Sequence, residues 1–407
     1  MIEIKTCEVC DNIHLKEVMN LGDHPMCDDL KKIPSDEVCK NYPINILFCT
    51  KCLTAHQKYQ VPKLKLFPST YHYRAKFTSD VLNGMKDLVE DIMISNPNLK
   101  KDFVLDIGCN DGSLLNFFQE KGFITVGVEP TNAAIDAMKN KHEVYRDYFS
   151  NNVANRIRSE KGIPSIITFT NVFAHIENLK EVLEALNTLM GEETQLIIEN
   201  HYLGSIIDHN QFDTFYHEHP RTYSATSFSY IAKNLNCKIK KISFPSRYGG
   251  NIRVFLSKIK DDQSHTDENV IKIIKKEKGF PEKIVSLNKK MKLWIINKKS
   301  YIDILFKKYG PLHAKAFPGR AAILIKLLDI DNNVFCAVYE KPGSFKINHY
   351  VPGTKIPIKS DDELKSINKN VPIINLAWHI PEEIRLYLLK LNVANQIIDI
   401  VSDTDFK

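Results

Sequence analysis

The sequence predicts an α/β fold, in which a mostly parallel, doubly wound sheet is flanked by a metal-binding N-terminal domain and a smaller C-terminal α/β domain. Three observations support this prediction. An apolar strand, a glycine turn and a helix start follow one another over residues 103–115. Strand and helix patterns alternate on both sides of a charged helical stretch, and two Cys-x-x-Cys pairs lie near the N-terminus. We therefore expect domains over residues 1–70, 71–260 and 261–407.

The composition argues against several classes of protein. The chain of 407 residues is 43% hydrophobic and 26% charged, and its net charge of +6 arises from 55 basic and 49 acidic residues. Because this charge is nearly balanced and no nucleic-acid-binding motif occurs, we expect no nucleic-acid partner. The first residues lack the pattern of a signal peptide, and no apolar run approaches membrane-spanning length. We expect a cytoplasmic protein without a membrane partner, present as a monomer or a small homo-oligomer.

The two cysteine pairs, Cys7 with Cys10 and Cys49 with Cys52, predict a metal site. Four thiolates from two such turns suit tetrahedral zinc, and a closed four-cysteine shell makes that zinc structural rather than catalytic. The pairs are 38 residues apart, so a hairpin or a small subdomain has to bring them together. The alternative is redox-active or free thiols. A redox Cys-x-x-Cys, however, normally occurs once, beside a βαβ pattern, and we favour zinc.

An aromatic segment over residues 66–77 follows the second pair. Tyr71 and Tyr73 alternate, so in an extended segment they share one face. Two interpretations stay open: packing between domains, or a wall over a polar substrate.

The glycine turn predicts a nucleoside site. Gly108 and Gly112 let the backbone approach a ligand, and Ser113 is expected to cap the helix that begins there. Asp106 precedes the turn, and Glu129 ends the next strand, where an acid commonly holds ribose hydroxyls. The alternative is a plain tight turn between strand and helix. The dinucleotide pattern Gly-x-Gly-x-x-Gly is absent from this turn.

This turn resembles motif I of class I methyltransferases, which use S-adenosylmethionine. The resemblance implies a Rossmann-like sheet, with the turn against the methionine part of the cofactor and the acid on its ribose. The cofactor-binding residues implied in this way are Asp106, Gly108, Asn110, Gly112, Glu129, Pro130 and Asn171.

The rest of this domain follows the same alternation. The predicted helices cover residues 78–96, 132–140 and 180–190, the predicted strands 164–171 and 194–199, and a closing hairpin 237–257. Asn171 and His175 come at the carboxyl end of a buried strand, where ligands collect in open α/β sheets.

The run Tyr216-His217-Glu218-His219 is the most unusual chemistry in the chain. In an extended loop, Tyr216 and Glu218 would face one way and the two histidines the other. Such a loop supplies a base that titrates near neutrality, a carboxylate to orient it and a phenol donor. The alternative is a hydrogen-bonded surface loop, but so dense a cluster after a sheet strand favours function.

Taken together, the motifs resemble those of the sugar C-methyltransferases that act on nucleotide-linked 4-keto deoxysugars. The shared motifs are the two cysteine pairs, the stretches 171–176, 212–219, 249–253 and 352–358, and the stretch 376–384. The resemblance implies a base region at Glu218 and His219 and further active-site residues at Tyr216, His175 and Tyr73, with Tyr71 beside the last. Two positions depart from the family pattern, Tyr248 and Asn251, and they leave the identity of the sugar open.

In the C-terminal domain, residues 261–308 predict long helices with a solvated charged face. Beyond them, helices are predicted at 320–328, 361–367 and 382–391 and strands at 334–338, 371–376 and 396–401. The turn from Ala316 to Arg320 resembles the family's glycine turn, and Arg320 is expected to contact the phosphates of a sugar nucleotide. Ala316 replaces a usual glycine, which argues against a second cofactor at this turn.

The expected reaction is methyl transfer from S-adenosylmethionine to C3 of a nucleotide-linked 4-keto sugar, in the biosynthesis of a branched-chain sugar for a surface polysaccharide or a glycosylated product. His219, supported by Glu218, would remove the C3 proton, and Tyr216 or His175 would stabilise the enolate oxygen. The alternatives are O- or N-methylation of a sugar nucleotide and a non-catalytic sugar-nucleotide-binding relative. The nucleotide, dTDP, GDP or CDP, stays open.

Overall fold

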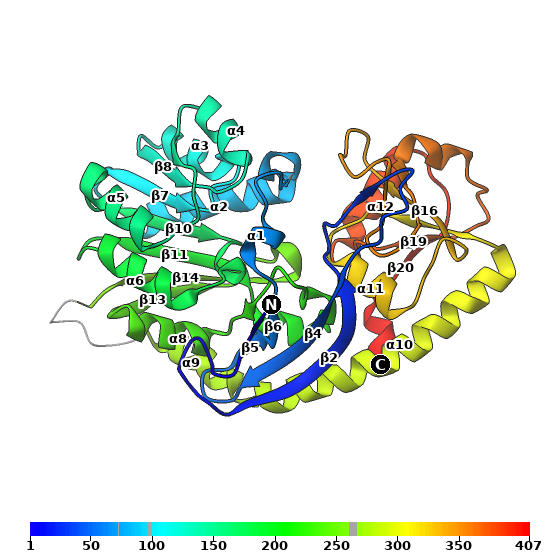
Figure 1. Ribbon diagram of the computed structural model, residues 1–407, viewed down its shortest axis with the longest axis horizontal. Coiled ribbons are helices and arrows are strands. Elements are labelled where there is room, and N and C mark those ends of the chain that lie inside the picture. The colour runs from blue at the N-terminus through cyan, green and yellow to red at the C-terminus, as the bar shows by residue number, and fades with distance from the viewer. Residues whose placement is uncertain (72, 97–98, 260–266) are drawn as a thin grey trace.

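The computed structural model describes residues 1–71, 73–96, 99–259 and 267–407. Figure 1 shows an α/β body on each side of the molecule. The long helix α10 (Phe280–Tyr309) and the long strands β2 (Leu15–Pro25) and β4 (Asn41–Cys49) run between the two bodies.

The larger body is built on a seven-stranded sheet with the order β13-β14-β11-β10-β7-β8-β9. Its strands are β7 (Phe103–Ile107), β8 (Ile124–Val128), β9 (Glu143–Tyr145), β10 (Ile166–Thr170), β11 (Gln195–His201), β13 (Cys237–Ser243) and β14 (Asn251–Lys258). The pairs from β9 to β11 are parallel, and β13 and β14 form the antiparallel hairpin at one edge. The predicted doubly wound sheet that closes on a hairpin is confirmed.

Helices cover both faces of this sheet because both faces are apolar. Its helices are α2 (Ser79–Ser95), α3 (Ser113–Glu120), α4 (Ala133–Lys139), α5 (Asn151–Lys161), α6 (Leu179–Leu189), α7 (Leu203–Asp208) and α8 (Ala225–Asn234). Within β7, Val104 packs in the core shared with α2 and α3, while its neighbour Leu105 packs in the core shared with α5, α6 and α8. This alternation is the period of two expected of a strand.

The start of α3 differs from the prediction in one respect. Gly112, not Ser113, is the N-cap residue, and its φ of +79° is the left-handed conformation that favours glycine. The Ser113 hydroxyl instead donates to Asp111 Oδ1 at 2.6 Å, so it holds the turn rather than the helix amides.

The N-terminal segment forms a four-stranded antiparallel sheet that includes a strand from the larger body. The order is β12-β5-β4-β2, with β5 (Thr54–Gln57) paired to β12 (Arg221–Thr222). The predicted hairpin between the cysteine pairs is the long β2–β4 ribbon. Short elements complete the segment, namely β1 (Ile2–Glu3), β3 (Lys31–Lys32), β6 (Tyr59–Gln60) and α1 (Lys63–Leu66).

The C-terminal body holds a five-stranded parallel sheet with the order β18-β16-β15-β19-β20. Its elements are β15 (Leu312–Lys315), α11 (Ala321–Leu327), β16 (Phe335–Glu340), β17 (His349–Tyr350), β18 (Ile358–Ser360), β19 (Ile373–Asn375), α12 (Pro381–Lys390) and β20 (Ile397–Asp399), preceded by α9 (Glu268–Lys276). In chain order the strands run 3-2-1-4-5, so the order of the strands reverses between β15 and β19, which is the switch point where doubly wound folds bind ligands. The predicted helix at 361–367 is a 3₁₀ turn, Asp361–Ser366, and the short strand β15 was not predicted.

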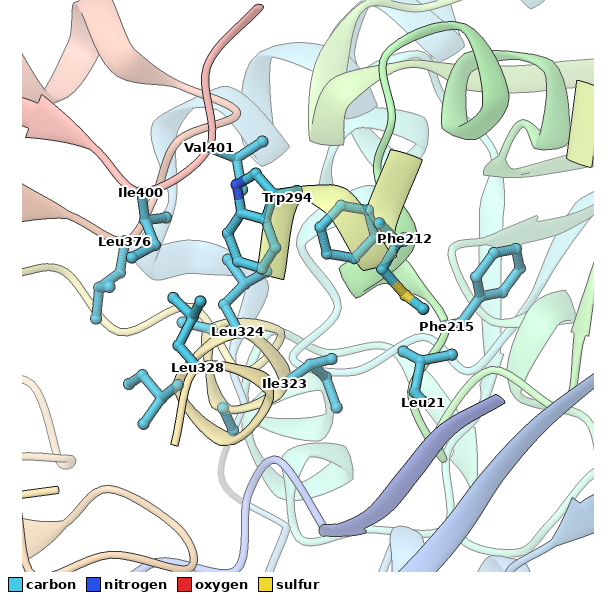
Figure 2. Close-up of a cluster of buried hydrophobic side chains, with 14 of the residues drawn as sticks. Leu21, Phe212, Phe215, Trp294, Ile323, Leu324, Leu328, Leu376, Ile400 and Val401 are labelled. Carbon is cyan, nitrogen blue, oxygen red and sulfur yellow. The ribbon is translucent and has the colours of Figure 1, made fainter. Parts of the chain in front are cut away.

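An apolar core joins the C-terminal body to the larger one. Figure 2 shows Phe212 and Phe215 directed into this core together with Trp294 of α10 and Leu324 of α11. The rings of Phe212 and Trp294 are 5.1 Å apart. Among the described residues, no helix is long and apolar enough to cross a membrane.

Candidate active site

A cavity of about 1070 Å³ opens between the carboxyl ends of the central strands, the aromatic N-terminal segment and the C-terminal sheet. The structure brings most of the predicted site residues to its wall. These are Tyr73, Asp106, Gly108, Asn110, Glu129, Pro130, Asn171, His175, Tyr216, Glu218 and His219. Tyr71 also lines it, whereas Gly112 does not.

The acid that follows β8, Glu129, is buried and accepts three hydrogen bonds at the cavity wall. Glu129 Oε1 accepts hydrogen bonds from the Thr131 amide at 2.9 Å and the Thr131 hydroxyl at 2.6 Å. Its Oε2 accepts the Asn110 amide at 3.0 Å. A carboxylate oxygen has two lone pairs, so Oε2 keeps acceptor capacity toward the cavity. This acceptor fits the ribose hydroxyls of S-adenosylmethionine, which would donate to it.

The two glycines of the turn lie close to different parts of the structure. Gly108, with a φ of +72°, lies at the cavity wall, and a Cβ on it would come within 2.5 Å of the Val172 side chain. A Cβ on Gly112 would come within 2.7 Å of His142 and 3.1 Å of the Ala137 backbone. The Cα of Gly112 thus faces α4, and this glycine allows α3 and α4 to approach closely, while its predicted cofactor contact stays a prediction.

Asp106, in β7, is buried and lines the same cavity. Its Oδ1 accepts the Thr168 hydroxyl at 2.7 Å. Burial raises the pKa of Asp106 to about 7, the negative charge of Glu129 adds to that rise, and the Thr168 hydrogen bond opposes it. Asp106 is thus poised between its neutral and charged forms near neutrality.

Asn171 is held by Asn251, one of the two positions that depart from the family pattern. The Asn251 amide donates to Asn171 Oδ1 at 3.1 Å and to Glu199 Oε1 at 3.0 Å. Glu199 is fully buried and pairs with Arg247 at 2.6 Å and Arg253 at 2.7 Å, and these cations hold its pKa low against the effect of burial. Asn251 therefore has a structural role, and the side chain of Tyr248, the other departure, lies outside the described part of the structure.

The 216–219 run is a tight turn, not the extended loop expected from the sequence. The His219 amide donates to the Tyr216 carbonyl at 2.9 Å, which curls the chain. Tyr216, Glu218 and His219 consequently all line the cavity. Only His217 turns away, and its Nε2 pairs with the Tyr42 carbonyl at 3.0 Å. The predicted shared face of the two histidines is wrong for this reason.

His219 lies among other aromatic rings of the cavity. Its ring centroid is 4.2 Å from that of Tyr216, 5.0 Å from that of His175 and 4.9 Å from that of His201. Burial lowers the pKa of His219 well below its usual value, and the nearby His201 and His175 lower it further. Burial also lowers the pKa of His175 to about 4 and that of His201 to about 3. The cluster is therefore uncharged at neutral pH.

The tautomer of His219 follows from its backbone partner. Nδ1 lies 3.0 Å from the Thr214 carbonyl oxygen, and since a carbonyl only accepts, Nδ1 carries the proton. The lone pair is then on Nε2, the arrangement that a general base requires. The acceptor that orients the ring is thus a backbone carbonyl, not the carboxylate of Glu218.

The Glu218 carboxyl has a hydrogen-bond partner other than His219. Tyr71 donates its hydroxyl to Glu218 Oε2 at 3.4 Å, and the Glu218 carbonyl pairs with His175 Nδ1 at 2.6 Å. Burial raises the pKa of Glu218 well above its usual value, and the charge of Asp28 adds to the rise. The expected support of His219 by this carboxylate is corrected accordingly: the Glu218 carboxyl contacts Tyr71, and its raised pKa favours the protonated form.

The C-terminal sheet supplies the opposite wall. Ala316 has a φ of +64°, which explains why a glycine is usual at this position. Arg320 lines the cavity, but its Nε donates to Asp213 at 2.8 Å. This guanidinium is already paired with Asp213, and its predicted phosphate contact stays a prediction. Sequence reasoning also missed His201, Lys346 and His379, each of which lines the cavity.

The four cysteines lie as a tetrahedral metal site requires. Their sulfur atoms are within 4.8 Å of one another, with Cys7 and Cys52 at 3.3 Å and Cys10 and Cys49 at 3.6 Å. Zinc–sulfur bonds of about 2.3 Å place thiolates about 3.8 Å apart, so the cluster fits zinc. The site is remote from the cavity wall, since none of these cysteines lines the cavity.

Comparison with protein families gives three matches in order along the chain. Residues 7–67 match a zinc binding domain, residues 77–242 a methyltransferase domain and residues 246–395 a C-methyltransferase C-terminal domain.

Among curated proteins, the C-methyltransferase NovU of Streptomyces niveus is 27% identical over 255 residues. The match covers 62% of this chain and 60% of that relative.

Solved structures show more distant similarity. A S-adenosylmethionine-dependent methyltransferase from Clostridium acetobutylicum is 15% identical, with a TM-score of 0.36, and the match covers 44% of this chain and 92% of that one. Magnesium protoporphyrin IX methyltransferase from Synechocystis, solved with bound S-adenosylmethionine, is 13% identical, with a TM-score of 0.33 and coverage of 44% and 80%. The three domain matches and the similarity to NovU support a S-adenosylmethionine-dependent C-methyltransferase family, with a class I methyltransferase domain between a zinc-binding domain and a C-methyltransferase C-terminal domain.

Proposed function

We propose that the protein is a C-methyltransferase that acts on a nucleotide-linked 4-keto sugar, at the carbon next to the ketone. The observation that carries the proposal is the lone pair of His219 Nε2 in the same cavity as the buried acid Glu129. A neutral base and a ribose-binding acid across one cavity suit proton removal beside a bound methyl donor. The name of NovU as a C-methyltransferase and the C-terminal domain match support carbon as the acceptor.

The cofactor residues and the substrate residues occupy different walls. Asp106, Gly108, Asn110, Glu129 and Asn171 would hold S-adenosylmethionine, which supplies an electrophilic methyl group when bound. Pro130 lines the same wall. The switch point of the C-terminal sheet lies between β15 and β19, and it faces the cavity. Residues within 315–320 and 377–384 line the cavity on this side. We assign the nucleotide of the sugar substrate to this wall.

In the proposed reaction, the ketone acidifies the neighbouring C–H bond. His219 Nε2 takes that proton, and the electron pair of the C–H bond passes to the ketone oxygen as an enolate. Tyr216, whose ring centroid is 4.2 Å from that of His219, lies at the same wall as Glu218, whose raised pKa favours the protonated form, and either group would donate a hydrogen bond to this oxygen. The four cysteines would hold zinc, which would stabilise the fold, since a closed four-cysteine shell leaves no open position for chemistry.

The test is incubation with S-adenosylmethionine that carries a ¹³C-labelled methyl group and a panel of dTDP-, GDP- and CDP-linked 4-keto sugars. NMR of the product is expected to show the labelled methyl coupled to a ring carbon next to the ketone. A methyl on oxygen or nitrogen would show one of the alternative methyltransferases. If no sugar nucleotide of the panel is methylated and calorimetry shows no binding of S-adenosylmethionine, the protein is a non-catalytic relative.

A further inference from the structure

The loop that carries His219 is fastened to the C-terminal domain by a buried ion pair. Asp213 Oδ2 accepts Arg320 Nε at 2.8 Å, and Oδ1 accepts the second guanidinium nitrogen. Trp378 adds a third donor, its Nε1 at 2.9 Å from Asp213 Oδ2. The Arg320 guanidinium also lies over the Trp378 ring, 5.4 Å from its centroid. Two side chains of the C-terminal domain thus hold one carboxylate of the methyltransferase segment.

Asp213 directly precedes the residue that orients His219. The next residue, Thr214, presents the carbonyl that accepts the Nδ1 proton of His219. The Thr214 amide donates in turn to the Gln211 carbonyl at 3.0 Å, and Gln211 Oε1 contacts Arg320 at 3.3 Å. The direction of the Thr214 carbonyl therefore depends on how the Asp213 side chain is held.

Apolar packing alone does not define that direction. Phe212 and Phe215 flank this turn and anchor it in the core beside Trp294, as Figure 2 shows. Burial of these rings is non-directional, so it fixes the depth of the turn but not the rotation of one peptide. A bidentate pair between a carboxylate and a planar guanidinium does define an orientation.

We propose that Asp213 is a positioning residue that, held by Arg320 and Trp378, fixes the tautomer and orientation of His219. The catalytic meaning of that orientation rests on the function proposed above. The arrangement makes the base depend on the docking of the C-terminal domain. The C-terminal domain, to which we assign the sugar nucleotide, would then also orient His219, the base that removes the proton of the sugar.

The first test needs no substrate. Ring nitrogens of the ¹⁵N-labelled full-length protein are observed by long-range ¹H–¹⁵N NMR, and the His219 signals are identified by their loss in His219→Gln. Wild-type protein is expected to show a protonated Nδ1 and an unprotonated Nε2. In Asp213→Asn and in Trp378→Phe, which removes only the indole donor, the His219 signals are expected to move toward a mixture of tautomers. Unchanged His219 signals in both variants would overturn the proposal.

The second test separates positioning from stability. Asp213→Asn is expected to lower kcat about 100-fold, while KM for the sugar nucleotide changes by no more than about twofold. Lys298→Met is the matched control, because it removes another buried ion pair of the same body, 2.8 Å from Asp405, without contact to the loop. It is expected to lower Tm and leave kcat and the His219 signals unchanged. If no sugar nucleotide is methylated, the proposed function fails, and the NMR result still decides the role of Asp213.

Discussion

Arg221, directly behind the histidine turn, forms an ion pair with Glu8, which lies between the first two cysteines of the metal site. The guanidinium nitrogen and the carboxylate oxygen are 2.6 Å apart, and Arg221 is fully buried. The same guanidinium donates to the carbonyl of Ile176, the residue after His175. The metal site is therefore connected to both histidine-bearing turns by one buried side chain.

Loss of the metal is expected to disturb the fold and, through Glu8 and Arg221, the active site. Cys49→Ser is expected to reduce the zinc content from about one ion per chain to a small fraction of that and to lower Tm by at least about 5 °C. Elemental analysis and thermal unfolding measure these effects. Cys39→Ser is the control, because the Cys39 thiol lies outside the cluster and donates only to the Asp29 carbonyl. Full zinc content in Cys49→Ser would contradict the assignment.

Glu129 is expected to be the main ribose-binding group. Glu129→Gln removes the charge and should raise the dissociation constant for S-adenosylmethionine at least about 10-fold, since hydrogen bonds to charged groups contribute about 1.5–3 kcal/mol. Isothermal calorimetry measures the affinity. Glu143→Gln changes an acid on β9 that pairs with Lys161 at 2.7 Å away from the cavity, and it should bind the cofactor as the wild type does. Equal affinity in both variants would remove Glu129 from the site.

The two histidines of the turn form a matched pair of variants. His219→Gln is expected to lower kcat at least about 100-fold, because the general base is lost. His217→Gln should retain turnover, since His217 faces Tyr42 outside the cavity. Steady-state kinetics with circular dichroism of both variants makes the comparison. Full turnover in a folded His219→Gln would contradict the assignment of the base.

The pH dependence of turnover provides a separate check on this base. A histidine base acts in its neutral form, and the pKa of His219 is held well below its usual value by burial and by His201 and His175. Turnover should therefore stay constant as the pH falls through about 6.5 and decline only below that value. A decline centred at the usual histidine pKa would show a solvent-exposed base instead.

Asp106 makes stability depend on pH. Its pKa is raised in the folded protein to about 7 from an ordinary value of 3.8, so the folded state binds more protons than the unfolded state between these values. The contribution of Asp106 to stability is therefore present below about pH 4 and is lost as the pH rises to about 7. Thermal unfolding of wild type and Asp106→Asn across this range should show Tm curves that diverge in this window. Parallel curves would contradict the raised pKa.

Local patterns predicted most of the sheet and the cofactor side of the site. The strand at 103–107, the acid at 129 and the hairpin at 237–257 are set by short-range apolar periodicity and turn residues, which a sequence displays directly. The four cysteines are likewise a spacing signal. Asn110, Pro130 and Asn171 reach the cavity because they follow strands whose ends meet at one edge.

The rest of the fold and of the candidate site depended on contacts between segments that are far apart in the sequence. A tight turn, not an extended chain, places His219 in the cavity, and no pattern in Tyr216 to His219 distinguishes the two. Arg320 pairs with Asp213, more than a hundred residues earlier in the chain. The motif around Arg320 gives no sign of this ion pair, so the motif alone suggested a phosphate site. His201 was a detectable signal, because it ends β11 directly after a buried strand as Asn171 does after β10.

The removal of a sugar C–H proton by the histidine turn can be measured with a 4-keto sugar nucleotide deuterated at C3 and C5, the two carbons next to the ketone. One deuteron is expected to be released to solvent for each methyl group transferred, and His219→Gln is expected to slow both events together. A methylated product that retains all of its deuterium at C3 and C5 would contradict proton removal by the histidine turn.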